Sequence, residues 1–478
     1  MSITESRAGE AHWLSGRRTV ALASLTGANL LVFASVTIMN VALPDVRADL
    51  ELSASSTQGI VTLYSLTFGT LILLAGRLAD VVGLRRCLTA GLVAFSIASL
   101  AGGLASEAAV LLTMRAIQGA AGAFVAATAV SLMSVTFPRG HHRQVAFATL
   151  GVVMGIGTAG SFLLGGALVD LLSWRWCLLV NAPLALVLAA GVAATAPPGP
   201  RPGRARVDVI GAAIITAALG ALVLGLDRSA VWGWTHPGTA GLLVAGVLGI
   251  AIFVATLRSK HHRLVPLWLL RDRSRASAYA SAAVGGVGMF AGMFVLTAFL
   301  QEAKDLSPVW IGLAFVPFGI GAVAATWTLP ALRSRVSPAR VLALGLVLTA
   351  VAVGTLVALR PESGYPTGVL PAMLLLGSGG TVVMVTAGDV ATAGAGGDSG
   401  VAGAMVNSMQ QVGAALGTAL LTAVMTAATR EQLASGSQPL DAVVAGYARA
   451  GLVGTAILAA ATVGVVLLGR AADEARTA

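Results

Sequence analysis

The chain has 478 residues, of which 56% are hydrophobic and only 10% are charged, and its mean hydropathy is +0.87. Soluble proteins carry about 25% charged residues, so the composition excludes a soluble globular protein and indicates a polytopic membrane protein. The net charge of +10 comes from short basic clusters between apolar runs. Such clusters are typical of the positive-inside bias and indicate no nucleic-acid partner. Cys87 and Cys177 alone provide neither a metal cluster nor a disulfide framework.

Fourteen long apolar runs follow one another along the chain. Each predicts a transmembrane helix, because backbone polar groups in lipid have to be hydrogen-bonded internally. The alternating ten-residue segments of a membrane β-barrel are missing. We therefore expect an all-α integral membrane protein with about fourteen spans. The runs cover residues 19–43, 57–76, 86–105, 108–136, 145–171, 176–196, 208–227, 238–257, 276–300, 309–330, 340–359, 367–388, 401–428 and 447–469.

The distribution of basic residues between the spans predicts the orientation. An even number of spans places both termini on one side, and 22 of the 30 Lys and Arg residues fall on that side. Seven fall on the other side and one lies within a span. The positive-inside rule therefore predicts a multi-pass protein of the plasma (inner) membrane with both termini in the cytoplasm.

An internal repeat divides the chain into two halves. Residues 78–93 align without gaps on residues 332–347, and the same offset of 254 carries the first, second and fifth spans onto the ninth, tenth and thirteenth. Both copies begin on the same side of the membrane, so the repeat is parallel. Two similar bundles around a midplane site favour a transporter that works by alternating access.

The repeat also predicts the domain boundaries. We expect an N-terminal six-helix bundle over 1–196, a cytoplasmic linker with two inserted transmembrane helices over 197–257, and a C-terminal six-helix bundle with its preceding loop over 258–478.

We expect a substrate cavity between the spans, and the candidate lining residues include Ser35 in the first span, Gln118 in the fourth and Asn181 in the sixth. Asn29, Phe33, Thr37 and Asn40 lie along one stripe of the first predicted helix. Tyr64 in the second span is a similar candidate, and its alternative role is packing or interfacial anchoring.

The loop after the second span reads Gly-Arg-Leu-Ala-Asp-Val-Val-Gly-Leu-Arg-Arg and begins at Gly76. It resembles the signature loop of the major facilitator superfamily, with Asp80, Gly83, Arg85 and Arg86 in the expected places. Gly83 permits a tight turn, and the Asp80 carboxylate can pair with an arginine or a helix N-terminus. The resemblance implies a latch that gates the cytoplasmic side. The alternative is an ordinary solvated turn.

The first span carries a more specific resemblance. Its segment TIMNVALPD is similar to the fourteen-span drug:proton antiporter branch of that superfamily, which usually has an acidic residue where this chain has Ser35. A buried carboxylate is a natural counter-charge for cationic drugs. We therefore expect neutral or anionic substrates rather than cationic ones.

The fourth span contains an arginine. Arg115 and Gln118 share one helical face, and an intramembrane arginine usually faces an interior cavity or a partner. The position also resembles the family's fourth-span motif, which implies a role in proton coupling. Glu107 and Asp45 are candidate partners. The alternative is that Arg115 snorkels to the membrane surface.

The fifth span, GVVMGIGTAGSFLLGGALVD, is rich in small residues that favour close helix packing. It resembles the antiporter signature helix, which implies a packing role for Gly151, Gly155, Gly165 and Gly166. A proline normally precedes the double glycine, and here Phe162 stands in its region. Plain small-residue packing is the alternative to a special role in antiport.

Further resemblance extends the match over almost the whole chain. It includes SWRWCLLVNAPLA around Asn181 and GVAGAMVNSMQQVGAALGTALLTAV in the thirteenth span. Within that span Asn407, Gln410 and Gln411 share a face and offer neutral hydrogen-bonding groups to the cavity. Their alternative role is to hold neighbouring helices together.

These patterns predict a secondary active transporter that exports small amphipathic organic compounds, such as drugs, antibiotics or a toxic metabolite, in exchange for protons. Its expected partners are the substrate, protons and the lipid bilayer, and we expect a monomer that needs no cofactor or metal. An importer or facilitator on the same fold remains the alternative. A membrane-embedded receptor or enzyme would concentrate His, Asp or Glu at one depth, and no such cluster is present in the sequence.

Overall fold

The computed structural model of the protein describes residues 16–137, 141–197, 208–259, 267–395 and 399–477. Regular structure in these ranges is helical throughout. Eleven of the described helices are long and apolar enough to cross a membrane. Three shorter apolar segments lie in α3, α6 and α9, at residues 59–72, 160–171 and 210–226. The structure thus confirms an all-helical membrane protein, and the count of fourteen spans stays a prediction.

The N-terminal half begins with one long helix and continues through six more. They are α2 (Gly16–Asp49), α3 (Ala54–Val82), α4 (Leu84–Gly103), α5 (Ala108–Thr136), α6 (His141–Leu171), α7 (Trp176–Leu179) and α8 (Asn181–Thr195). Two helices follow, α9 (Val209–Trp232) and α10 (Pro237–Ser259). Helix α9 packs against α3 and α17, whereas α10 packs against α9 and exposes most of its apolar surface.

The C-terminal half repeats the pattern with more interruptions. Its α-helices are α11 (Leu267–Arg271), α12 (Arg273–Ala298), α13 (Pro308–Ala314), α14 (Val316–Arg333), α15 (Pro338–Gly354), α16 (Leu370–Thr392), α17 (Ser399–Ala434) and α18 (Pro439–Thr477). A π-helical turn, η2 (Phe299–Ala303), extends α12, a 3₁₀ turn, η3 (Thr355–Ala358), extends α15, and a second π-helical turn, η4 (Tyr365–Val369), precedes α16.

The offset of 254 residues found in the sequence relates the helices of the two halves. It carries the bounds of α4 onto residues 338–357, which α15 and η3 occupy. It carries α3 onto residues 308–336, where α13 and α14 lie. The second copy is broken at Phe315 because Pro317 lacks the amide that a continuous helix would need.

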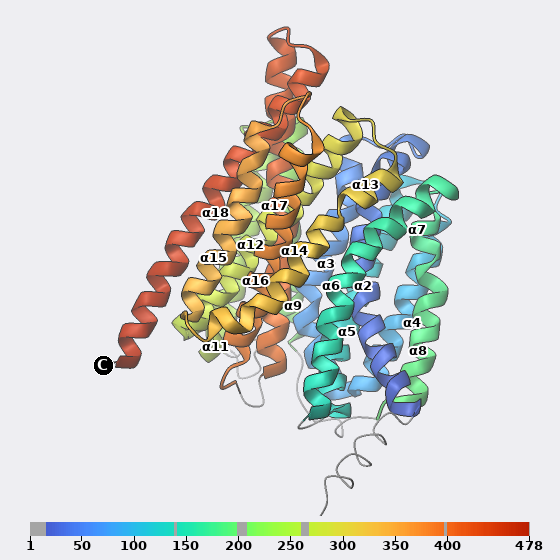
Figure 1. The fold of residues 1–478 in the computed structure, drawn as a ribbon, viewed down its shortest axis with the longest axis vertical. Coiled ribbons are helices and arrows are strands. Elements are labelled where there is room, and N and C mark those ends of the chain that lie inside the picture. The colour runs from blue at the N-terminus through green and yellow to red at the C-terminus, as the bar shows by residue number, and fades with distance from the viewer. Residues whose placement is uncertain (1–15, 138–140, 198–207, 260–266, 396–398, 478) are drawn as a thin grey trace, which may run out of the picture.

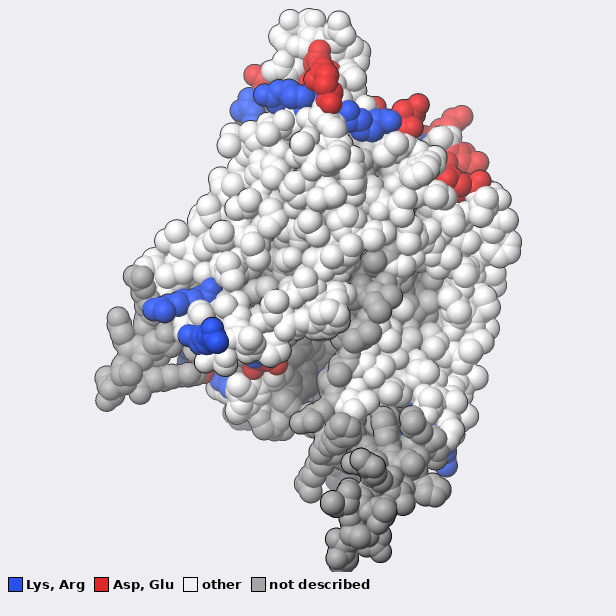
Figure 2. All heavy atoms as spheres, viewed as in Figure 1, with Lys and Arg blue, Asp and Glu red and all other residues white. Residues whose placement is uncertain are grey.

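The ends of helices α2 and α18 distinguish the two ends of the helical bundle. Helix α2 begins, and α18 ends, at the same end of the bundle, which we call the terminal end (Figure 1). The α2–α3 and α17–α18 connections lie at the other end, which we call the opposite end. Charged side chains on the face in Figure 2 lie toward these two ends, with a broad uncharged band between them. That band is the pattern expected of a surface that contacts lipid.

Glycines let the helices of the C-terminal half approach closely. A Cβ atom on Gly413 of α17 would lie 1.8 Å from the Ala283 carbonyl oxygen of α12. One on Gly377 of α16 would lie 2.0 Å from the carbonyl oxygen of Phe318 in α14. Such contacts between backbones are typical of membrane helix interfaces, where small residues replace the large apolar side chains of soluble cores.

Candidate functional site

A buried arginine lies in the interior of the N-terminal half. Arg115 of α5 is only 1% exposed, so it does not snorkel to the membrane surface. Placing a guanidinium in such an environment is costly unless nearby groups compensate for the lost water. Its surroundings therefore define the strongest candidate site in the described part of the chain.

The guanidinium is held by neutral acceptors from three helices. Nε donates to the Ile60 carbonyl oxygen of α3 over 3.1 Å, and Nη1 donates to Ser35 Oγ of α2 over 3.3 Å. Nη1 also donates to Gln118 Oε1 on its own helix. The Tyr64 ring lies 4.4 Å from the guanidinium carbon, which adds a cation–π contact.

The network continues into a fourth helix. Gln118 Nε2 donates to Ser99 Oγ of α4 over 2.7 Å, and Ser99 Oγ donates to the Phe95 carbonyl oxygen over 2.6 Å. The Tyr64 hydroxyl donates to the Val32 carbonyl oxygen of α2 over 2.8 Å. The site thus joins α2, α3, α4 and α5 through a chain of polar groups.

Arg115 has no negative partner among the described residues. Neither Glu107 nor Asp45, the two candidate partners from the sequence, forms an ion pair with it. Its Nη2 group has no hydrogen-bond partner in the described part of the chain. The positive charge is therefore stabilised by neutral dipoles and one aromatic ring, and one edge of the guanidinium is left unsatisfied.

Of the expected cavity residues, Ser35, Tyr64 and Gln118 lie around Arg115. The other candidates in α2 form no hydrogen bond with Arg115 in the described part of the chain. Asn29 Nδ2 donates to the Leu25 carbonyl oxygen of its own helix over 3.1 Å, and Thr37 Oγ1 donates to that of Phe33 over 3.3 Å. Phe33 packs edge-on against Phe68. Asn40 is buried.

The remaining expected cavity residues lie in other helices. Asn181 is buried at the start of α8, and its Nδ2 donates to the Cys177 carbonyl oxygen over 3.0 Å. In α17, Gln410 and Gln411 are buried and Asn407 is half-buried. The Gln411 amide oxygen has no partner among the described residues, so it is free to accept a hydrogen bond.

The loop between α3 and α4 forms the tight turn that its glycine suggests. Gly83 has φ of +103°, a value that side chains rarely tolerate, and its amide donates to the Ala79 carbonyl oxygen over 2.8 Å. Arg85 Nη1 donates to the Ala196 carbonyl oxygen over 3.2 Å and so ties α4 to the end of α8. Gly76 has open space around it, and Arg86 is exposed. The Asp80 side chain lies outside the described residues.

Helix α6 packs closely on both halves. A Cβ atom on Gly165 would lie 3.1 Å from Ile38 Cα, and Gly166 is buried. Phe162 stacks on Phe315 of the other half with ring centroids 4.0 Å apart. The packing of Gly151 and Gly155 lies outside what the structure describes.

Several hydrogen bonds between the halves involve residues that sequence reasoning missed. Asp170 Oδ2, at the end of α6, accepts from Ser307 Oγ over 3.0 Å and from the Val309 amide over 3.1 Å. Gln301 Nε2 of η2 donates to the Val41 carbonyl oxygen of α2 over 3.1 Å. No sequence motif predicts these contacts. The sequence does show that Asp170 is an acidic residue at the end of a predicted span.

One further bond between the halves lies near the middle of α3 and α17. Ser408 Oγ donates there to the Gly69 carbonyl oxygen. A Cβ atom on Gly69 would lie 2.9 Å from Gln411 Cβ, so the two helices approach closely at this level.

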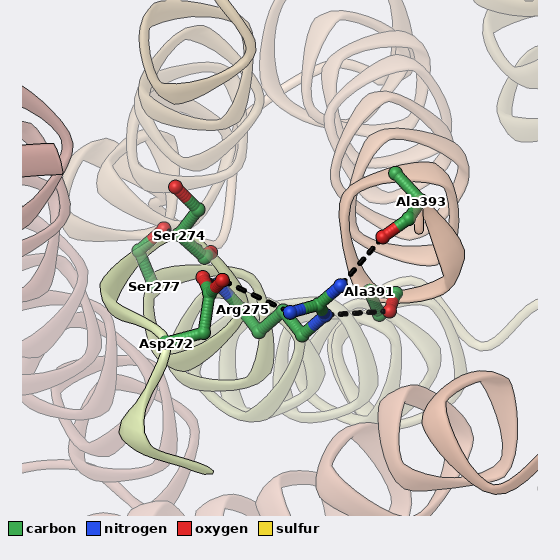
Figure 3. A network of polar contacts seen from close by, with 6 residues as sticks. All are labelled: Asp272, Ser274, Arg275, Ser277, Ala391 and Ala393. Carbon is green, nitrogen blue, oxygen red and sulfur yellow. Dashed lines mark hydrogen bonds and ion pairs between the residues drawn. The ribbon is translucent and has the colours of Figure 1, made fainter. Parts of the chain in front are cut away.

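The C-terminal half carries its own polar contacts at the terminal end. Figure 3 shows Arg275 of α12 reaching the last carbonyl groups of α16: Nε donates to Ala391 over 3.1 Å and Nη2 to Ala393 over 2.5 Å. Its Nη1 also pairs with Asp272 over 2.9 Å. Arg333 forms an ion pair with Asp389. Charged side chains thus tie α12 and α14 to the end of α16 at the terminal end of this half.

The described residues form an all-helical integral membrane protein with a buried polar network, and the family that it matches is one of membrane transporters rather than enzymes. The chain belongs to the Major Facilitator Superfamily, whose family model matches residues 25–418.

Relatives include several resistance and export proteins. The puromycin resistance protein of Streptomyces alboniger is 39% identical over 97% of this chain and 94% of that protein. The cephamycin export protein of Amycolatopsis lactamdurans is 34% identical over 86% of each chain, and the lincomycin resistance protein of Streptomyces lincolnensis is 32% identical over 88% and 87%.

Solved structures share the fold at low identity. A bacterial homologue of the lysosomal transporter Spinster, in an inward-facing and unoccupied conformation, has a TM-score of 0.67 at 15% identity and covers 95% of this chain and 98% of that one. The POT family transporter PepTSo has a TM-score of 0.70 at 14% identity, with coverage of 96% of this chain and 98% of that one. These similarities establish the fold alone.

Proposed function

We propose that the protein exports small amphipathic organic compounds of the antibiotic class across the cell membrane in exchange for protons. The observation that carries the proposal is the near full-length identity of 39% with a protein named for puromycin resistance. Relatives named for cephamycin export and lincomycin resistance support the same direction of transport.

The mechanism is alternating access between the two halves, with both termini in the cytoplasm. The terminal end is then the cytoplasmic end and the opposite end faces outward, as the excess of basic residues on the terminal side suggests. One chain supplies both halves of the pathway, so a monomer suffices. Residues 1–196 and 258–478 are the two bundles, and residues 197–257 carry the inserted helices.

Within this mechanism Arg115 is the residue that couples substrate movement to protons. It is buried, joined to α2 and α3, and surrounded by neutral groups. A change in the charge near it therefore alters the free energy of the surrounding helices strongly, because the site has low polarity. Ser35, Tyr64 and Gln118 form the polar wall of the site. We expect Asn407, Gln410 and Gln411 of α17 to supply polar groups to the transport pathway from the second half. The loop from Gly76 to Arg86, with Asp80, gates the cytoplasmic side.

A growth-inhibition panel in an efflux-deficient bacterium tests export. Puromycin, lincomycin and a cephamycin are the first compounds, with wild type beside Arg115→Ala and Asp80→Asn. Arg340→Ala is the matched control, because Arg340 is an exposed arginine. We expect the wild type and the control to raise tolerance to at least one compound and the two site variants to lose that tolerance.

A second measurement tests coupling and direction. In inverted membrane vesicles, adding an exported compound should dissipate an imposed proton gradient, and a protonophore should abolish accumulation of that compound. Greater sensitivity of cells that express the protein would instead favour an importer or a facilitator. Export that continues after the gradient is removed would contradict proton exchange.

A further inference from the structure

The first turn of α13 is capped by a residue from the other half of the molecule. Ser307 holds the N-cap position of α13, where a serine side chain usually accepts a hydrogen bond from the second or third amide of its helix. Here the Ser307 side chain makes no such bond. Its hydroxyl donates to Asp170 Oδ2 instead, and the same oxygen accepts from the Val309 amide, the second of the helix.

The first turn of α13 needs a hydrogen-bond acceptor, and Asp170 of the N-terminal half provides it. Pro308 is the first residue of α13 and has no amide hydrogen. The Val309 amide is therefore the first donor of the helix that needs an acceptor. A carboxylate is a strong acceptor for amides at a helix N-terminus, and the one that serves here belongs to α6.

Other contacts between the same segments form an apolar layer below the cap. Phe162, two helical turns before Asp170, stacks on Phe315. A Cβ atom on Gly312 would lie 2.5 Å from the Phe162 carbonyl oxygen, so α6 and α13 touch backbone to backbone. Aromatic packing thus holds α6 to the α13–α14 segment near the opposite end, and Asp170 lies at the exposed rim of this contact.

We propose that Asp170 is a positioning residue of the transport cycle: it holds the opposite end shut by capping α13 across the two halves, and this cap breaks whenever that end opens. Because the hydrogen bonds are exposed, water can replace them, so the cap is reversible. The proposal rests on alternating access in the proposed function. Its first test, the distance between two spin labels, follows conformation and needs no known substrate.

A matched control lies at the same end of the molecule. Asp49 Oδ2 accepts from Arg175 Nη1 over 2.6 Å and from Trp174 Nε1 over 3.1 Å. All three residues belong to the N-terminal half, so this pair does not have to separate when the halves move. Asp49 and Asp170 therefore differ in whether their hydrogen bonds cross between the halves.

Distance measurements between spin labels test the proposal. Labels are attached to Leu171→Cys and Trp310→Cys, two exposed positions next to Asp170 and Val309. Native Cys87 and Cys177 are buried and remain in place. In the purified full-length protein, Asp170→Ala should increase the population with separated labels about fivefold, the change expected for losing a modest interaction. Asp170→Asn, which keeps an acceptor oxygen, should restore much of the wild-type distribution, and Asp49→Ala should leave it unchanged.

A cross-linking experiment tests the same cap by locking it. The pair Asp170→Cys and Ser307→Cys should form a disulfide on oxidation, stop transport, and recover when reduced. The pair Asp49→Cys and Arg175→Cys, joined by a bifunctional thiol reagent that spans the length of the lost arginine side chain, should cross-link without loss of transport. Failure of the first pair to cross-link, transport by its oxidised form, or equal label distances in Asp170→Ala and Asp49→Ala would each overturn the proposal. Failure of the antibiotic panel alone would overturn only the proposed function.

Discussion

Arg115 faces Ser35 across the α2–α5 interface, with Nη1 3.3 Å from Oγ, and no described carboxylate pairs with it. The serine hydroxyl is a neutral acceptor, so the interior of the N-terminal half holds an uncompensated positive charge. An acidic residue at position 35 would attract a cationic compound, whereas the serine of this chain carries no negative charge. We therefore expect the residue at position 35 to influence the charge of the compounds that the protein exports.

Ser35→Asp should supply the missing counter-charge. A hydrogen bond to a charged group contributes roughly 1.5–3 kcal/mol, and the guanidinium is already desolvated in the wild type. We expect the melting temperature of the purified protein to rise by about 2 °C or more. In the growth panel, the compounds exported should shift from acidic toward basic ones. Both effects follow from neutralising Arg115.

Two variants separate charge from shape at this site. Ser35→Asn has nearly the volume of aspartate without the charge and should produce neither effect. Gln118→Glu places a carboxylate at the same Nη1 group from α5 instead of α2, because Gln118 Oε1 already accepts from Nη1, and it should reproduce the shift. Identical export profiles in Ser35→Asp and Ser35→Asn would count against a role for charge.

Much of the fold could be predicted from the sequence because it depends on composition and on spacing along one chain. The hydropathy pattern indicates membrane helices, and the offset of 254 residues relates α4 to α15 as the structure has them. The position of Arg115 and Gln118 on one face also follows from helical periodicity. The break between α13 and α14 was missed, since Pro317 lies in an apolar run that reads as one continuous span.

The candidate site was less predictable because contacts between helices have no signal in helical periodicity. Asn29 and Thr37 share a stripe, yet each donates to a carbonyl of its own helix, an option that such side chains always have. The approach of Ser35 to Arg115, and of Asp170 to Val309, depends on how separate helices pack. Ser35 and Arg115 are 80 positions apart in the sequence, and no sequence pattern relates one to the other.

Gly413→Ala should destabilise the C-terminal half. The added methyl group would lie 1.8 Å from the Ala283 carbonyl oxygen, so α12 and α17 would have to move apart. Overpacking of this kind costs about 1–3 kcal/mol, which should lower the melting temperature in detergent. Gly388→Ala in α16 is the matched control, because no atom lies within 4 Å of its added Cβ. Equal melting of the two variants would show that the α12–α17 contact is looser than described.

Arg275→Ala should weaken the end of α16. The guanidinium bonds the carbonyl oxygens of Ala391 and Ala393, which lie at or just beyond the last turn and have no helical partner. Losing bonds to a charged donor should cost about 2 kcal/mol or more, measured as a lower melting temperature. Arg275→Lys should recover only part of this, since lysine lacks the planar fork. Arg273→Ala changes an exposed arginine two residues earlier and should have little effect; a similar loss there would point to net charge rather than capping.

Reporter fusions should place both termini in the cytoplasm. Of the 30 basic residues, 22 lie on the terminal side of the predicted spans, and positive loops are retained in the cytoplasm. Green fluorescent protein fused after Ala478 should therefore fluoresce, and alkaline phosphatase at the same point should be inactive. Phosphatase inserted at Gly436, in the α17–α18 connection at the opposite end, should be active. Active phosphatase at both points would place residues 436 and 478 on the same outer side of the membrane. Helix α18 would then not cross the membrane, which would refute a cytoplasmic C-terminus and the fourteen-span topology.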